Sequence, residues 1–190
     1  HCGVVQDRSS VAAIGAAGEQ EADLLLALCE KAGATECYRS EDPEQADMLL
    51  GARRMAIQAL ESMGDWLLDD VAIPRRRLAE AVERIEEIAA KHDVMIATFG
   101  HAGDGNLHPT IVTPRGDQAA AARALVAFDD ILGVALSLEG TVTGEHGVGL
   151  LKRDALTREL DPVAIDLHAR IKEALDPRGI LNPGKSLPRW

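Results

Sequence analysis

The most informative stretch of the 190-residue chain is TFGHAGDGNLHP, which spans residues 98–109. It places His101 and His108 on either side of Asp104-Gly105, a pair typical of a two-residue hairpin because type I′ turns need positive φ at both central positions. Such a turn would put His101 directly opposite His108, with Asn106 on the same face. Opposed Cβ atoms lie about 4.5–5.5 Å apart, close enough for two imidazoles to bind one metal ion. Histidines that only stack or bond to carbonyls are the alternative.

A second polar cluster, TVTGEHGVG, covers residues 141–149 and sets a carboxylate beside an imidazole between glycines. Glu145 could complete a two-histidine, one-carboxylate set, which leaves a coordination position open for water or substrate. His146 would then act as an acid or base, because an unligated imidazole titrates near neutral pH. Exposed turn chemistry is the other interpretation, since polar residues between glycines are common in surface loops.

These side chains must be positioned by a framework of helices and strands. Apolar spacing and boundary residues predict helices over 19–32, 43–63, 78–91, 117–138 and 162–175, and strands over 36–39, 67–73, 94–101 and 107–112. Because the tight hairpin favours antiparallel pairing, the predicted fold class is α+β. We expect an antiparallel sheet with helices packed on one face, a ferredoxin-like cap, followed by a C-terminal helical segment.

Composition excludes several classes of protein. The chain has 31 acidic and 20 basic residues and a formal net charge of −11, which argues against a nucleic-acid partner. Its most apolar stretch, residues 124–138, is interrupted by Asp129 and Asp130, so no transmembrane segment is expected. Three cysteines without a Cys-x-x-Cys pair fit a reducing compartment. We therefore expect a cytoplasmic protein, with peripheral association at the inner face of the membrane as an option.

Three motifs, in order along the chain, resemble one known family: GHAGDGNLHP at 100–109, GEHGVG at 144–149 and LNPGK at 181–185. They are similar to the C-terminal substrate domain of FAD-linked 2-hydroxy-acid oxidoreductases of the vanillyl-alcohol-oxidase type. That branch holds the glycolate oxidase flavin subunit, D-lactate dehydrogenase and D-2-hydroxyglutarate dehydrogenase. The resemblance implies a substrate (cap) domain over 1–140 and a loop-helix segment over 141–190 that in relatives packs toward the flavin domain. From the resemblance we expect that this chain does not include the N-terminal FAD-binding domain of those relatives.

The resemblance also implies roles for single residues. The implied ligands of a divalent metal, zinc in most relatives, are His101, His108 and Glu145. His146 matches the base that takes the substrate hydroxyl proton, and Asn106 matches a substrate-contacting position. Arg53, in LLGARR, matches a carboxylate-binding arginine, with a surface helix charge as the alternative. Asn182 matches a cofactor contact, with a turn residue as the alternative.

The activity that the resemblance implies is FAD-dependent oxidation of a D-2-hydroxy acid, such as lactate or glycolate, to the 2-keto acid. Its partners would be the substrate, an FAD-binding domain or subunit, and an electron-acceptor subunit or quinone. The chain alone should be inactive, because nothing in it supplies the flavin site. Two other functions stay open on the residues alone. One is a metal-dependent hydrolase whose open coordination position activates water, and the other is an interaction module with structural histidines.

Overall fold

The computed structural model describes residues 2–6, 11–15, 18–34 and 36–187. The chain divides into two units, His1–Ser62 and Met63–Trp190, and each is described on its own. The boundary expected between residues 140 and 141 separates a cap segment from a segment that would face a flavin domain. It stays a prediction.

The first unit contains a three-stranded antiparallel sheet and two helices. Its strands are β1 (Cys2–Gln6), β2 (Val11–Gly15) and β3 (Glu36–Ser40), in the order β2-β1-β3, and its helices are α1 (Glu19–Lys31) and α2 (Pro43–Met63). The predictions of both helices and of β3 are confirmed. The sequence analysis missed β1 and β2, because apolar runs of five residues give too little periodicity to identify a strand.

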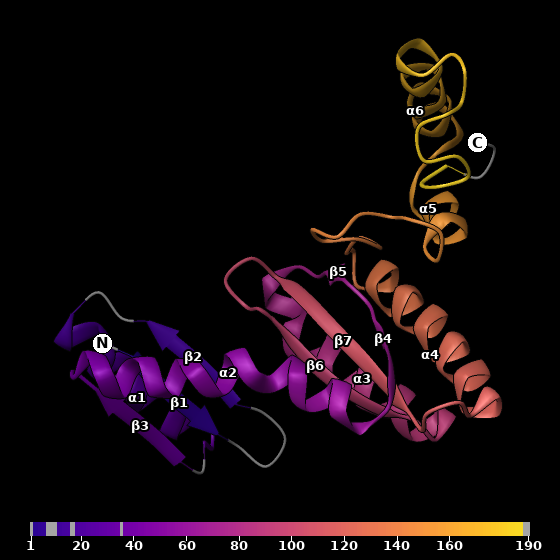
Figure 1. Cartoon of the computed structure of the whole chain (residues 1–190). Coiled ribbons are helices and arrows are strands. Elements are labelled where there is room, and N and C mark those ends of the chain that lie inside the picture. The colour runs from indigo at the N-terminus through magenta and orange to yellow at the C-terminus, as the bar shows by residue number, and fades with distance from the viewer. Residues whose placement is uncertain (1, 7–10, 16–17, 35, 188–190) are drawn as a thin grey trace. The chain divides into compact units, whose positions relative to one another are not determined.

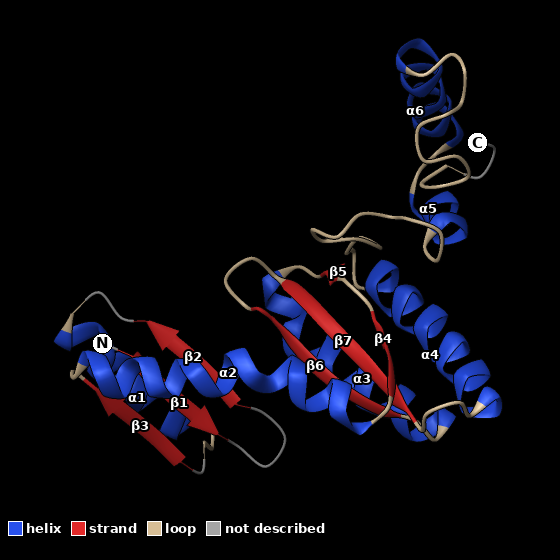
Figure 2. Ribbon diagram, viewed as in Figure 1, coloured by secondary structure: helices blue, strands red, loops and turns tan. Residues whose placement is uncertain are grey.

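The second unit is built around one long strand, β7 (Asn106–Thr113), at the centre of an antiparallel sheet (Figures 1 and 2). One edge of β7 pairs with β6 (Met95–His101). The other edge pairs directly with both β4 (Asp65–Leu68) and β5 (Val71–Ala72), at different points along its length. The single strand predicted over 67–73 is therefore two strands. They are separated by Asp69 and Asp70, which are both buried.

Helices cover one face of this sheet. They are α3 (Leu78–His92), preceded by a 3-10 turn at Arg75–Arg77, and α4 (Gln118–Ser137), followed along the chain by α5 (Arg153–Glu159) and α6 (Pro162–Leu175). Leu107 and Ile111 of β7 pack with apolar residues of α3 and α4 in one core, which confirms the α+β prediction. The same core includes Val142 and Leu156, so the segment after α4 packs with the rest of the unit. The sequence analysis did not predict α5.

Local chemistry fixes the helix ends. The Asp117 carboxylate accepts hydrogen bonds from the backbone N–H groups of Ala119 and Ala120 at the start of α4. Asp161 caps α6 in the same way, and Pro162 occupies its first turn. Among the helices that the structure describes, none has the length and apolar character needed to cross a membrane.

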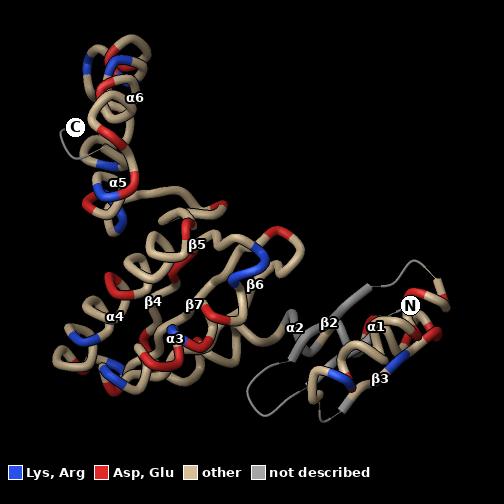
Figure 3. The backbone as a smooth tube through the Cα atoms, turned by 180° about the vertical axis from the view of Figure 1, so that it is seen from behind, with Lys and Arg blue, Asp and Glu red and all other residues tan. Residues whose placement is uncertain are grey.

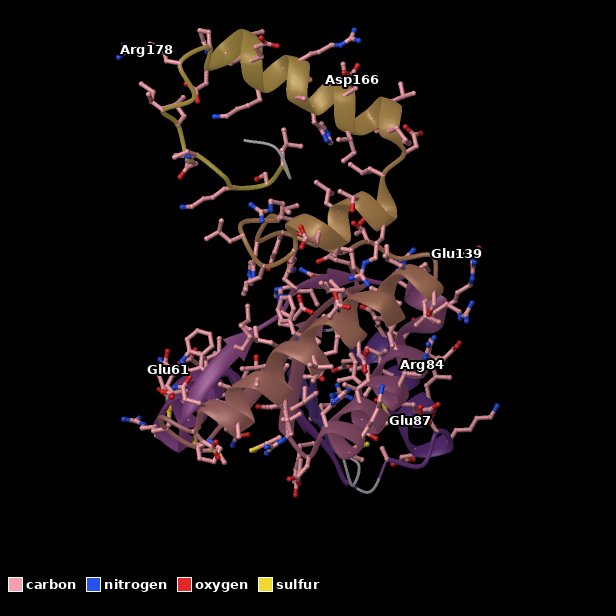
Figure 4. All side chains as sticks on the ribbon, turned by 90° about the vertical axis from the view of Figure 1, so that its right-hand side faces the viewer. Glu61, Arg84, Glu87, Glu139, Asp166 and Arg178 are labelled. Carbon is pink, nitrogen blue, oxygen red and sulfur yellow. The ribbon has the colours of Figure 1, made fainter. Side chains whose placement is uncertain are left out.

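Ion pairs add contacts between neighbouring helices of the second unit. Lys91 of α3 pairs with Asp130 of α4 at 2.7 Å, and Arg158 of α5 pairs with Asp129 at 2.6 Å. Figure 3 shows acidic and basic residues interspersed along this unit. Glu139, which is labelled in Figure 4, lies at the surface of this unit and pairs with Arg76 at 3.1 Å.

Candidate functional site

The hairpin between β6 and β7 presents the two histidines in a register that differs from the prediction. His101 lies opposite Asn106, and Phe99 lies opposite His108, so the turn holds four residues and not two. Of residues 102–105, all of them described, only Gly105 has a positive φ, 77°, whereas a type I′ turn needs two. The carbonyl of Gly105 also accepts a hydrogen bond from the backbone of Ile73, which holds the wider turn in place. The predicted direct opposition of His101 and His108 is therefore wrong.

The histidines nevertheless share a face of the sheet, because a register shift of two residues preserves side-chain orientation. Their ring centroids lie 5.4 Å apart, edge to face. This is the face opposite the α3/α4 core, since Leu107 and Ile111 alternate with Asn106 and His108 along β7.

Glu145 joins the two histidines from the loop after α4. Its Oε1 lies 3.3 Å from Nε2 of His108 and 3.7 Å from Nε2 of His101. One potential ligand atom from each of the three side chains lies within 4.8 Å of the others. The His108 side chain is only 11% exposed, whereas those of His101 and Glu145 are 40% and 52% exposed. The cluster is therefore anchored in the sheet and open to solvent on one side.

Two imidazole nitrogens and one carboxylate suit a divalent cation such as zinc. A further feature of His108 fits this chemistry. Its Nδ1 atom is buried and has no hydrogen-bond partner among the described residues, but it lies 3.6 Å from Oδ1 of Asp70. Histidines that bind metals usually direct their second nitrogen at such a carboxylate. Burial and the neighbouring His146 lower the pKa of His108, which favours the neutral form that metals bind.

His146 stands beside the cluster. Its ring stacks on that of His108, with centroids 4.9 Å apart and planes 8° apart, and its Nε2 lies 3.7 Å from Oε1 of Glu145. A second group, Asp70, His108 and His146, also has potential ligand atoms within 4.8 Å of one another. The predicted acid or base thus lies next to the predicted metal ligands.

Asp70 is central to the site, and the sequence analysis did not assign it a role. Its carboxylate is buried and accepts hydrogen bonds from the Thr143 hydroxyl and from the backbone N–H groups of Gly144, Glu145 and His146. Burial by itself would raise the pKa of Asp70, but these donors and the charge of Lys152 hold it below the ordinary value. The signal available in the sequence was two adjacent aspartates inside an apolar strand.

Lys152 and Asp69 lie beneath this carboxylate. The Lys152 ammonium lies 2.9 Å from Oδ1 of Asp69 and 3.8 Å from Oδ2 of Asp70, and it donates to the backbone carbonyl of Asp70. All three residues are buried. Burial raises the pKa of Asp69, and the Lys152 charge opposes part of that rise. The sequence analysis did not predict this buried ion-pair group.

The remaining predicted residues differ in how they are placed. Asn106 is buried near the cluster, and its Oδ1 has no hydrogen-bond partner within the described part of the chain. Arg53 lies in α2 of the first unit, and its side chain is outside the described residues. Asn182 has a φ of 47°, and both its carbonyl and its side-chain oxygen accept hydrogen bonds from Lys185. These contacts fit the turn alternative for Asn182, and its cofactor role stays a prediction.

Comparison with known proteins adds independent information. Residues 10–186 match the family described as FAD linked oxidases, C-terminal domain. The chain is 43% identical over 168 residues to glycolate oxidase subunit GlcD of Bacillus subtilis, covering 88% of this chain and 36% of the relative. It is 34% identical over 166 residues to a D-lactate dehydrogenase of Archaeoglobus fulgidus, covering 87% of this chain and 36% of the relative. The chain therefore spans about a third of the length of these relatives.

A solved structure supports the fold alone. The 4-ethylphenol oxidase of Gulosibacter chungangensis, in its isoeugenol complex, superposes with a TM-score of 0.59 at 18% sequence identity. The superposition covers 94% of this chain and 39% of that protein.

Proposed function

The chain belongs to the family of FAD-linked oxidase C-terminal domains, and we propose that it is the substrate- and metal-binding domain of an FAD-dependent dehydrogenase or oxidase. The proposed reaction converts a D-2-hydroxy acid, such as lactate or glycolate, to the 2-keto acid. The names of the relatives, glycolate oxidase subunit and D-lactate dehydrogenase, support this class of substrate. The observation that carries the proposal is the convergence of His101, His108 and Glu145 from two strands and a distant loop.

In this proposal His101, His108 and Glu145 hold a divalent cation, with zinc as the first choice. When bound, the cation would polarise the hydroxyl and carboxylate oxygens of the substrate and lower the pKa of the hydroxyl. Binding two substrate oxygens at one centre would fix the orientation of the α-carbon. This would lower the entropic cost of reaching the reactive geometry.

His146 is the proposed acceptor of the hydroxyl proton. Its side chain is partly exposed and sits beside the ligand set, where a substrate on the open side could reach it. An imidazole nitrogen within reach of the substrate hydroxyl is suited to general-base catalysis. Asn106 is the proposed substrate contact, because its side-chain oxygen is buried near the cluster and unpaired among the described residues. Arg53 is proposed, from the family resemblance, to bind the substrate carboxylate as a bidentate pair.

A hydride acceptor is the chemistry that bound FAD would supply, and a separate domain or subunit is proposed to hold the FAD. An apolar stripe on α6 supports the proposal that residues 141–190 pack toward that domain. Val163, Leu167, Ile171 and Leu175 recur every fourth residue, and all four are exposed. Exposed apolar stripes of this kind mark interaction surfaces. Asn182, in the tail after α6, is the proposed cofactor contact. An electron-acceptor subunit or quinone is the proposed further partner.

The proposal is tested by titrating D-lactate, L-lactate and glycolate calorimetrically into the zinc-loaded chain. We expect metal-dependent binding of D-lactate or glycolate that is lost in a His101→Ala, His108→Ala double variant. The chain alone should form no keto acid, and adding a separately produced FAD-binding domain should restore keto-acid formation. Equal binding with and without zinc would contradict the proposal. Zinc-dependent hydrolysis of an ester or phosphoester panel by the chain alone would favour a hydrolase instead.

A further inference from the structure

Asp70 contacts His108 and the backbone of the loop that bears Glu145 and His146. We infer that Asp70 is a positioning residue: its carboxylate fixes the loop that bears Glu145 and His146, and it orients the His108 ring for metal binding. This inference rests on the proposed metal site and names a residue that holds the ligands without being one of them.

The loop contacts are concentrated on one oxygen atom. Oδ2 of Asp70 accepts from the Thr143 hydroxyl at 3.0 Å and from the backbone N–H groups of Gly144 at 2.8 Å, Glu145 at 3.1 Å and His146 at 3.0 Å. Successive N–H groups that converge on one anion form a backbone nest, and bonds to a charged acceptor are stronger than neutral ones. The loop backbone is thus held where Glu145 and His146 begin, which limits the positions that their side chains can reach.

The second contact is with His108. Nδ1 of His108 lies 3.6 Å from Oδ1 of Asp70, while Nε2 faces Glu145 at 3.3 Å. A carboxylate on the Nδ1 side favours the tautomer in which Nδ1 carries the proton. The Nε2 lone pair is then available on the side of His101 and Glu145, as the ligand set requires.

Asp70 is better suited to this supporting role than to metal ligation. Its side chain is only 1% exposed, and Oδ2 already receives four hydrogen bonds from the loop. A metal ion at that oxygen would have to replace donors that are held by the backbone. Lys152 adds a positive charge 3.8 Å from the same oxygen, which further opposes a cation there.

Asp69 provides a matched control. Like Asp70 it is buried, and it pairs more closely with the Lys152 ammonium, at 2.9 Å. Its backbone N–H donates to the Pro109 carbonyl, so it too is fixed against β7. Its carboxylate accepts hydrogen bonds from the backbone N–H of Asp70 and from the Lys152 ammonium, and neither the 143–146 loop nor His108 is among the partners found for it in the described part of the chain. Replacing Asp69 disturbs the same ion-pair group without touching the metal-binding side chains.

The experiment measures zinc affinity of the 190-residue chain by competition with a chromophoric chelator, together with the visible absorption of bound cobalt. Asp70→Asn should weaken zinc binding by about 10–100-fold, the range for loss of an outer-shell partner, and should alter the cobalt spectrum. Asp69→Asn should leave both readouts close to wild type, even where it lowers stability. Circular dichroism establishes that each variant is folded.

Thr143→Val keeps the inference testable if Asp70→Asn does not fold, because it removes only one of the four donors. It should weaken zinc binding by a smaller factor than Asp70→Asn, and an unchanged affinity in this folded variant would overturn the inference. Equal losses in the Asp69 and Asp70 variants would also overturn it, since they would indicate general destabilisation. A wild-type chain that binds no zinc would instead overturn the proposed function on which the inference rests.

Discussion

Among the glycines of the 144–149 loop, Gly144 is the one whose replacement by alanine should disturb the candidate site most. A Cβ built at Gly144 would lie 2.4 Å from Oδ1 of Asn106 and 2.7 Å from Oδ1 of Asp70. Favourable carbon contacts begin at roughly 3.5 Å, so a neighbour must move. Asp70 is held by the loop donors and Asn106 is buried in β7, so neither can move freely. The loop itself is therefore expected to shift.

The cost follows from those contacts. Adding a methyl group to a tightly packed position typically costs about 1–3 kcal/mol. If the loop shifts enough to break one bond to the Asp70 carboxylate, the loss falls in the same range, because a hydrogen bond to a charged group contributes about 1.5–3 kcal/mol. We therefore expect Gly144→Ala to lower the free energy of unfolding by about 1–3 kcal/mol and to weaken zinc binding.

Urea titration followed by circular dichroism measures the stability, with Gly133→Ala as the matched control. Gly133 lies inside α4, and a Cβ there meets nothing within 4 Å. Gly133→Ala should raise the free energy of unfolding by about 0.5–1 kcal/mol, because glycine destabilises helix interiors relative to alanine. A Gly144→Ala protein as stable as wild type, with the same zinc affinity, would refute the proposed packing of the loop on Asp70.

Other predictions test the core, the electrostatics and the assignment of ligands. Ile111→Ala, at a fully buried core position, should lower the free energy of unfolding by about 2–5 kcal/mol in the same titration, and a negligible loss would contradict the described core. The pKa of Asp130 lies below its usual value because Lys91 and His92 bond to its carboxylate. The ionised Asp130 carboxylate therefore stabilises the fold above the usual carboxyl pKa, and this stabilisation is lost as the pH falls through the lowered pKa. Asp130→Asn should accordingly reduce the loss of unfolding free energy between neutral and acidic pH. An unchanged pH dependence would argue against the contacts of Asp130 with Lys91 and His92. Glu145→Gln should weaken zinc binding by at least about tenfold, whereas His146→Ala should leave zinc affinity near wild type, and the reverse order in chelator competition would exchange their assigned roles.

The sequence predicted which face of the hairpin carries three of the candidate residues, because alternation along a strand tolerates an error of two residues. The turn was assigned two residues and has four, yet His101, Asn106 and His108 still share a face. An error of one residue would have placed His101 and His108 on opposite faces. The adjacent Glu145 and His146 stood out because glycines surround them, although spacing alone could not show that they reach the hairpin.

Other features lay beyond sequence reasoning for physical reasons. The partners of Asp70 are mainly backbone N–H groups 74–76 residues away, and every residue type except proline offers that donor. The break between β4 and β5 was missed because the apolar residues around Asp69 and Asp70 dominate the strand pattern. Lys152 follows the glycine loop as an ordinary charge in the sequence, and only the fold shows that it is buried against two aspartates.

Metal content tests most directly the proposal that His101, His108 and Glu145 hold a metal ion. The chain should be purified without an affinity-tag metal, equilibrated with zinc, desalted, and measured by elemental analysis beside the His101→Ala, His108→Ala double variant. We predict one zinc ion per wild-type chain and a negligible amount in the folded double variant. Equal zinc content in the two proteins, whether high or negligible, would contradict the claim.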